Sequence, residues 1–257
     1  DGELPSTKTF LSLFGEQKFE EFKEVISSLK PGGIWQNEEV ATTSFHNKHP
    51  VLVKINAIEE GENSISHYVI VISDISVQKD AEDKLRYLAH YDFLTELPNR
   101  SLILEKLSEA IEKRKHSNEQ MALLFLDLDK FKHVNDSLGH AAGDALLKHV
   151  AQTLISLVSA RSIVARQSGD EFLVLIDSYS DIRDLENIAL RVNEKLSELM
   201  IIDNHPISIS SSIGIAVCPK NASSATDLIR NADIAMFHAK KGGRNQFKFY
   251  TEQMNEL

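Results

Sequence analysis

The alternation of apolar and polar residues in the first part of the chain predicts a small antiparallel sheet. A helical pattern lies around Phe19 to Leu29, and the breaker "PGG" follows it. Three runs rich in β-branched and aromatic residues come next: "WQNEEVATTSF", "PVLVKINAIEE" and "SHYVIVISDI". The turn signals "HNKHP" and "EGENS" separate the runs, which is typical of consecutive antiparallel strands. We therefore predict a mixed domain with an antiparallel meander over residues 1–76.

From Val77 the pattern changes to the spacing of a helix. In "VQKDAEDKLRYLAHYDFL", the residues Ala81, Leu85, Leu88 and Ala89 recur on one face among charged residues. We predict a connecting helix over residues 77–90. Its apolar stripe fits two arrangements equally well, namely packing on its own domain or pairing with the same helix of a second chain.

Helical and strand patterns alternate over residues 91–252. The helices are expected at "SLILEKLSEAIEKRK", "GDALLKHVAQTLISLV", "DLENIALRVNEKLSEL" and "ATDLIRNADIAMFHAKK". The strands are expected at "MALLFLDLD", "SIVARQ", "EFLVLI", "PISISSSIGIAVC" and "NQFKFY". This order predicts an α/β sandwich in which "SIVARQ" and "EFLVLI" form a hairpin around Ser168 and Gly169.

Composition narrows the class of protein. The 257 residues are enough for two modest domains, and the net charge of -10 argues against a general nucleic-acid binder. Cys218 is the only cysteine, which excludes an intrachain disulfide and fits a reducing compartment. No apolar run is long enough for a membrane span, and no signal peptide is visible. We expect a cytoplasmic fragment that does not itself contact a membrane. A membrane anchor in the full-length protein would lie outside these residues.

Carboxylates gather at the ends of two predicted strands. Asp127 and Asp129 end "LLFLDLD", and Asp170 and Glu171 follow the hairpin tip. If these strands are neighbours, the like charges repel strongly unless a cation lies between them, and carboxylate oxygens are the ligands of Mg²⁺ in phosphoryl-transfer sites. The alternative is that these acids are ordinary solvated turn residues.

Several ordered motifs resemble one enzyme family. "SGDEF" at residues 168–172 resembles the signature of the GGDEF diguanylate cyclases. "YDFLTELPNR", "LDLDKFKHVNDSLGHAAGDALL", "SIGIAVCP" and "ADIAMFHAKKGGRN" are similar to its other motifs, in the same order. The resemblance implies a palm-like sandwich whose central mixed or antiparallel sheet is flanked by helices. It also implies condensation of two GTP into cyclic dimeric GMP with release of two pyrophosphates.

The resemblance assigns the acids to a metal site. Asp127 and Asp170 match the metal-binding carboxylates, the carbonyl of Leu128 adds a ligand, and Glu171 serves a second metal. Asp170 and Glu171 are the implied catalytic residues and Mg²⁺ or Mn²⁺ the cofactor. Asp170 either helps to deprotonate the attacking 3′-hydroxyl or leaves that to the metal.

Asn135 and Asp144 match the residues that read guanine, and Phe131 belongs to the same substrate-binding segment. A carboxylate accepts hydrogen bonds from the N1–H and N2 amino groups of guanine, which adenine lacks. Without the resemblance, Asn135 reads equally well as a helix N-cap and Asp144 as a first-turn acid.

Lys132, Lys240 and Arg244 match the contacts to the triphosphate, where cations stabilise developing phosphate charge. Lys240 and Lys241, followed by Gly242, also make an ordinary helix C-terminus, and both interpretations hold together. No Gly-Lys-Ser/Thr loop is present, which argues against a P-loop nucleotidase.

Two positions depart from the family pattern. Ser168 replaces the first glycine of the signature, and we expect a side chain there to crowd the nucleotide or strain the turn without abolishing activity. The Arg-x-x-Asp of the product-inhibition site is replaced by "SARS", Ser159 to Ser162. We therefore predict no feedback inhibition through that site.

The first 76 residues resemble the later half of a PAS sensor domain, in "GGIWQNEEV" and "YVIVISDISVQKDAEDKL". The opening strands of such a domain are short or absent, so we expect an incomplete ligand pocket. The absence of cysteine here excludes flavin-adduct chemistry. His46 and His49 are more consistent with solvated residues than with haem ligands, and neither haem nor flavin is expected.

The cyclase resemblance implies that two domains meet face to face, each with one GTP, in an at least transient homodimer. The connecting helix would then be the control point between sensor and cyclase. A competing hypothesis is a non-catalytic GTP-binding regulatory module of a hybrid with a phosphodiesterase domain of the EAL family. A third is a purely structural dimerisation module, which leaves the carboxylate cluster unexplained.

Overall fold

The computed structural model describes residues 7–42, 47–61, 64–115, 119–202 and 205–255, and it describes side chains from residue 12 onward. The chain divides into two compact units, residues 1–86 and 87–257. The boundaries predicted from the sequence, 1–76, 77–90 and 91–252, remain predictions. Among the described helices, none combines the length and apolar composition needed to cross a bilayer.

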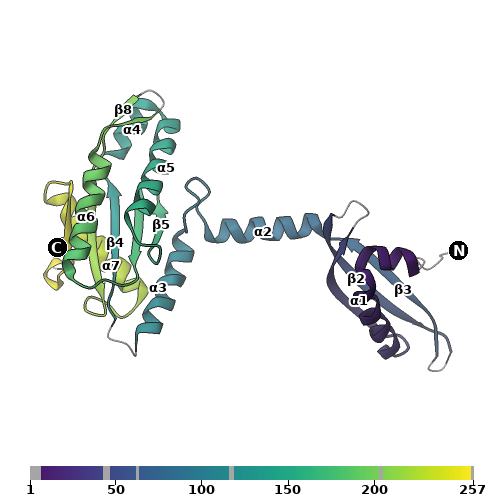
Figure 1. Cartoon of the computed structure of the whole chain (residues 1–257). Helices are drawn as coiled ribbons and strands as arrows, with labels where there is room; N and C mark the ends of the chain where they lie inside the picture. Colours follow the sequence, from purple (N-terminus) through teal and green to yellow (C-terminus); the bar gives the residue numbers. More distant parts are fainter. Residues whose placement is uncertain (1–6, 43–46, 62–63, 116–118, 203–204, 256–257) are drawn as a thin grey trace. The chain divides into compact units, whose positions relative to one another are not determined.

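Apart from most of a second helix at its end, the first unit consists of a helix packed on a three-stranded sheet (Figure 1). Its elements are α1 Thr7–Ser28, β1 Ile34–Thr42, β2 Lys48–Glu59 and β3 Ile65–Asp74. The strands pair in the order β1-β2-β3, antiparallel throughout, which confirms the predicted meander. The helix begins earlier than predicted and is interrupted at Gly15, whose φ of 80° is not helical.

One face of this sheet forms the core of the unit. Val53 and Ile55 of β2 are fully buried, and Phe22 of α1 packs on them. The Phe22 ring meets Trp35 edge to face, with centroids 5.5 Å apart. Strand alternation therefore decides which apolar residues are buried, because successive side chains point to opposite faces. His49 lies in β2, and His46 lies outside the described residues.

The connecting helix α2, Ser76–His90, confirms the helix predicted over residues 77–90. It buries none of its side chains, and Leu85 and Leu88 are 67% and 51% exposed. The apolar stripe of α2 therefore does not pack on its own domain, which was one of the two arrangements considered.

The second unit is built on a five-stranded mixed sheet. The strands are β4 Met121–Leu128, β5 Ile163–Ser168, β6 Glu171–Ile176, β9 Ser211–Cys218 and β10 Gln246–Phe249. Their order is β10-β9-β4-β6-β5, and only β10 and β9 run parallel. The β5–β6 hairpin is confirmed, and β4 lies between β6 and β9.

Helices cover both faces of this sheet (Figure 1). They are α3 Arg100–Arg114, α4 Phe131–Leu138, α5 His140–Leu157, α6 Ile182–Ser197, α7 Ala225–Lys241 and the short 3-10 helix Glu252–Asn255. Leu124 and Leu126 of β4 face the core under α5 and α6, whereas Leu123 and Phe125 face the core under α3 and α7. The predicted sandwich is thus present. The side chain of Asp127 lies on the same face of β4 as Leu123 and Phe125, the face covered by α7.

Two elements differ from the sequence prediction. The helix α4 was not expected, because "FKHVNDSL" is short and largely polar. The single strand expected over residues 206–218 is broken into β8 His205–Ile207, which pairs with β7 Met200–Ile202, and β9. Between them, the Ile209 N–H donates to Leu196 O and Ser208 Oγ to Ser197 O. The end of α6 therefore holds this stretch away from the sheet.

Candidate active site

Carboxylates from two neighbouring central strands meet at one edge of the sheet. Asp127 of β4 pairs in register with Glu171 of β6, and Asp170 occupies the turn before β6. The Leu128 N–H points to the Asp170 carbonyl at 3.3 Å. The expectation that neighbouring strands bring these acids together is confirmed for Asp127, Asp170 and Glu171, and the antiparallel register of the strands is the cause.

The pKa values of these acids reflect burial and mutual repulsion. Burial is the largest influence on Asp127 and, with the charges of Asp170 and Glu171, raises its pKa to about 6. Burial also raises the pKa of Asp170, and Glu171 adds to the shift. Such shifts mark a cluster that favours a nearby cation.

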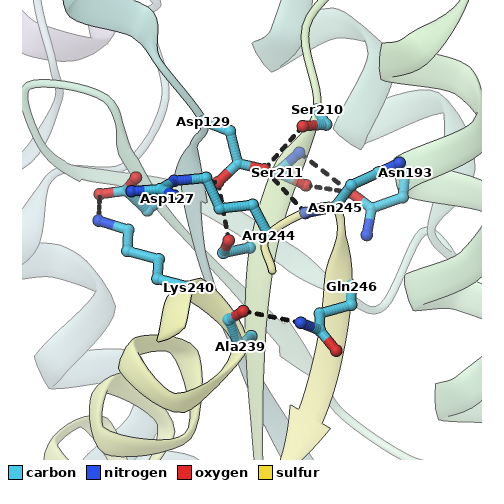
Figure 2. Close-up of polar contacts among 11 residues, drawn as sticks. Asp127, Asp129, Asn193, Ser210, Ser211, Ala239, Lys240, Arg244, Asn245 and Gln246 are labelled. Carbon is cyan, nitrogen blue, oxygen red and sulfur yellow. Dashed lines mark hydrogen bonds and ion pairs between the residues drawn. The ribbon is translucent and has the colours of Figure 1, made fainter. Parts of the chain in front are cut away.

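Lys240 brings a positive charge to this cluster from the last turn of α7. Its Nζ lies 2.6 Å from Asp127 Oδ2, and its charge opposes the rise in the pKa of both Asp127 and Asp170 (Figure 2). The helix ends at Lys241 with Gly242 as its cap, so the interpretation of this segment as a helix C-terminus is confirmed.

Asp129 is separate from the cluster, contrary to the expectation that both acids at the end of β4 would gather there. Its carboxylate accepts hydrogen bonds from the hydroxyls of Ser210 and Ser212 and from the Asn245 N–H. Figure 2 shows the carboxyl groups of Asp127 and Asp129 with different partners. Asp129 lies beyond the last residue of β4, so strand alternation no longer fixes its direction.

Contrary to the expectation from the sequence, Ser168 does not strain the signature turn. It is the last residue of β5 and pairs with Glu171, and positive φ in this hairpin is confined to Gly169, at 49°. The Ser168 hydroxyl donates to Glu171 Oε2 at 2.6 Å. Only the second position of the signature therefore needs the conformational freedom of glycine.

A partly buried arginine that the sequence analysis did not single out fixes the hairpin tip. Arg166 donates to the Gly169 carbonyl at 3.0 and 2.8 Å and to both carboxylate oxygens of Asp92. Asp92 also accepts from the N–H and hydroxyl of Thr95. Burial alone would raise the pKa of Asp92, but these hydrogen bonds lower it. The only signal for this role in the sequence was the position of Arg166, two residues before the signature.

The donor chemistry at the carboxylate edge fits a hard divalent cation. Asp127, Asp170 and Glu171 supply only oxygen, and burial raises the pKa of Asp127 and Asp170, so a cation beside them would favour their ionised form. Within the described part of the chain, no three His, Cys, Asp or Glu side chains already form a metal-holding group. In this structure Asp127 is instead paired with Lys240.

Asn135 and Asp144 lie on consecutive helices. Asn135 is in α4, whose end is closed by the Gly139 N–H donating to the Asn135 carbonyl. Asp144 is exposed in α5, directly after Gly143. A Cβ at position 143 would lie only 1.9 Å from Asn135 Oδ1, so Asn135 lies against the start of α5. Gly139 caps α5, so the interpretation as an N-cap and a first-turn acid is wrong.

The remaining predicted substrate residues have different environments. Phe131 is 8% exposed and packs in the core, which leaves only its backbone for a ligand, whereas Lys132 is exposed on α4. Arg244 lines a cavity of about 600 Å³ together with Asp129 and Lys130. Of the predicted cations, Lys240 therefore contacts the carboxylate cluster, Arg244 lies near Asp129, and Lys132 is exposed on α4.

At the position of the family's inhibition site, Ser159 and Ser162 contact each other. Their hydroxyl oxygens are 2.9 Å apart, and the Ser162 N–H donates to the Ser159 carbonyl. The two serines thus bond to each other across the turn between α5 and β5, and neither carries a charge.

Known proteins match this unit across its length. Residues 89–246 match the family described as "Diguanylate cyclase, GGDEF domain". The chain is 40% identical over 184 residues to the cyclic di-GMP phosphodiesterase PdeR of Escherichia coli, covering 72% of this chain and 27% of PdeR. It is 41% identical over 175 residues to the bifunctional diguanylate cyclase/cyclic di-GMP phosphodiesterase MucR of Pseudomonas aeruginosa, covering 68% and 25%.

A solved structure has the same fold. The GGDEF domain of TpbB from Pseudomonas aeruginosa is 36% identical, with a TM-score of 0.63, and the match covers 65% of this chain and 97% of that one. The chain spans about a quarter of the length of PdeR and MucR. The signature hairpin, the acid edge and the match over residues 89–246 place this chain in the diguanylate cyclase GGDEF-domain family.

Proposed function

We propose that this chain condenses two GTP into cyclic dimeric GMP and releases two pyrophosphates. One observation carries the proposal. The register of β4 against β6 places Asp127 beside Glu171 and the Asp170 turn, with Lys240 at the same edge. This combination of acids and a cation suits a metal-assisted attack of a 3′-hydroxyl on an α-phosphate.

Asp127, Asp170, Glu171 and the Leu128 carbonyl would hold Mg²⁺ or Mn²⁺. The ion would neutralise phosphate charge and acidify the attacking hydroxyl. Asp170 would accept the hydroxyl proton, unless the metal ion acidifies the hydroxyl enough to need no dedicated base.

Lys132, Lys240 and Arg244 would bind the triphosphate and stabilise the charge of departing pyrophosphate. Lys240 serves two roles in this proposal. It neutralises Asp127 before substrate binds, and the ammonium is then available to a phosphate oxygen once a metal ion takes over Asp127.

Guanine would be read by Asn135 and Asp144, and Gly143 gives a test. Gly143→Ala is expected to displace the Asn135 side chain, since the new Cβ would lie 1.9 Å from its Oδ1. The expected loss is about 3- to 10-fold in GTP affinity, the value of one hydrogen bond, with less discrimination against ATP. Isothermal titration with a non-hydrolysable GTP analogue measures it.

Asn135→Ala is the matched control for this change. A protein that already lacks the Asn135 amide has nothing for the new methyl group to displace. Adding Gly143→Ala to Asn135→Ala should therefore change the affinity little. Additive losses would remove Asn135 from the guanine site.

The chain is expected to lack product feedback through the Ser159–Ser162 turn. Neither serine offers the charge that an arginine or aspartate would bring to a cyclic dinucleotide. Titration of the protein with cyclic dimeric GMP should give no binding tighter than about micromolar, an affinity that corresponds to roughly 8 kcal/mol. Tighter binding that survives blockage of the active site with a GTP analogue would contradict this prediction.

Because each site would hold one GTP, two chains must meet during turnover. We propose a homodimer, at least transient, and the exposed Leu85 and Leu88 of α2 give the helices a face with which to pair. The first unit, interpreted as a PAS-like sensor domain, would regulate how the two cyclase units meet.

The second candidate is a non-catalytic GTP-binding module that regulates a phosphodiesterase. The observation that favours it is that PdeR, 40% identical over the matched residues, is named a phosphodiesterase and is much longer than this chain. In this case the site would bind GTP and release no product.

Incubation with GTP and Mg²⁺ over a series of protein concentrations decides between the candidates. Chromatography should find cyclic dimeric GMP and pyrophosphate, none after EDTA treatment, and a specific activity that rises with protein concentration as half-sites meet. Binding of GTP without product would support the regulatory module. Neither binding nor product would refute both.

A further inference from the structure

Asp129 is a buried carboxylate that joins three segments of the second unit. Its side chain is 3% exposed. Oδ1 accepts from the Ser212 hydroxyl at 2.7 Å, and Oδ2 accepts from the Ser210 hydroxyl at 2.7 Å and the Asn245 N–H at 3.0 Å (Figure 2). The end of β4, the start of β9 and the loop after α7 therefore meet at one acid.

The loop after α7 has a backbone that ordinary residues avoid. Arg244 and Asn245 have φ values of 65° and 47°, in the left-handed region where a Cβ is crowded. The Arg244 N–H donates to the Ala239 carbonyl at 3.2 Å, and the Asn245 N–H donates to Asp129. Two consecutive left-handed non-glycine residues persist only where surrounding contacts hold them.

This backbone determines where the Arg244 side chain goes. Arg244 Nε lies 4.0 Å from Asp129 Oδ1, and its side chain is 53% exposed. Among the described residues, no hydrogen bond joins the terminal amino groups of Arg244 to a protein acceptor. The inner end of the guanidinium thus lies near Asp129, within ion-pair range but beyond a hydrogen bond, and the outer end is open to a ligand.

We infer that Asp129 is a positioning residue that holds the Arg244–Asn245 backbone in its left-handed form and so aims Arg244 at the substrate phosphates. The inference rests on the proposed function. It gives the two acids at the end of β4 separate tasks: Asp127 pairs with Lys240 and would bind the metal ion, whereas Asp129 would position Arg244.

The first test is a double-mutant cycle with GTP and Mg²⁺. Asp129→Asn keeps the shape but replaces one acceptor by a donor, and we expect kcat/KM to fall about 10- to 100-fold through misplacement of Arg244. Arg244→Ala should lose about 100-fold or more. The double variant should lie within about 3-fold of Arg244→Ala, because Asp129 has then nothing left to position.

The second test is a rescue. Asn245→Gly adopts the left-handed backbone without help, so adding it to Asp129→Asn should restore most of the lost kcat/KM. A role of Asp129 in simply packing β4 against β9 would not be rescued at position 245. If Asp129→Asn does not fold, Ser210→Ala and Ser212→Ala replace it. These should give smaller losses with the same non-additivity.

Asn193→Ala is the matched control. Asn193 is also buried, and its Oδ1 accepts from the N–H and hydroxyl of Ser211; among the described residues, no hydrogen bond joins it to Arg244 or Asn245 (Figure 2). It should lower the thermal midpoint, leave kcat/KM within about 3-fold and combine additively with Arg244→Ala. The measurements on Asp129 are judged against this control.

The outcomes separate the two hypotheses. An active parent in which Asp129→Asn and Arg244→Ala are additive, with no rescue by Asn245→Gly, overturns the inference and leaves the proposed function intact. A parent that neither binds GTP nor forms product refutes the proposed function, and the inference falls with it.

Discussion

Asp170→Asn protein is expected to form cyclic dimeric GMP at least about 100-fold more slowly than the parent, because an amide neither binds a divalent cation well nor accepts a proton. The variant should nevertheless unfold at the same temperature or a higher one. Burial and the charge of Glu171 raise the pKa of Asp170, so the native state already disfavours its ionised form. Product chromatography and thermal denaturation on the same preparation measure both effects.

The combination of lost activity and retained stability is what separates a functional acid from a structural one. Glu109→Gln is the matched control, since Glu109 is an exposed acid of α3 paired with Lys106. It should leave activity unchanged. Product formation by Asp170→Asn within about 3-fold of the parent would refute the role of Asp170 and weaken the whole metal assignment.

Gly214→Ala is expected to cost about 3 kcal/mol or more of unfolding free energy, at the upper end for overpacking. Gly214 lies in β9 where α7 crosses the sheet. A Cβ there would lie 1.9 Å from the Ala232 carbonyl oxygen and 2.2 Å from the Met236 nitrogen, both atoms of the helix backbone. The helix must move as a body, which separates it from the sheet. Urea unfolding measures the loss.

Two comparisons test this reason. Gly143→Ala makes the same chemical change, but its new Cβ meets chiefly the Asn135 side chain, so its stability should change by no more than about 1 kcal/mol. Met236→Ala added to Gly214→Ala should not restore stability, since the clash is with backbone. An unchanged urea midpoint for Gly214→Ala would show that α7 and β9 are farther apart than described.

Much of the fold could be predicted from local pattern. The apolar runs ending at Asp127 and beginning at Glu171 are buried strands with charged ends, and the hairpin turn between Ser168 and Glu171 follows from its short loop. The three-stranded meander of the first unit was equally predictable, because β-branched runs and turn residues alternate there. These features depend on neighbours in the sequence.

The helix α4 and the break before β9 could not be predicted in this way. The helix is stabilised by Phe131, which is buried in the core, and by the close approach of Asn135 to Gly143. The apolar alternation continues across residues 206–218, yet contacts with the end of α6 redirect Ser208 and Ile209. In both places, packing against distant residues overrides the local pattern.

The sequence by itself determined which residues carry charge at the ends of the central strands, and hence that this edge would hold acids. Only the tertiary structure decided their partners. Asp127 meets Lys240 and Asp129 meets Asn245, more than a hundred residues away, and Arg166 reaches Asp92 across 74 residues. The physical reason is that strand register and helix packing bring such groups together. Local propensity depends on neighbours in the sequence, so it cannot predict contacts that form only when a long loop closes.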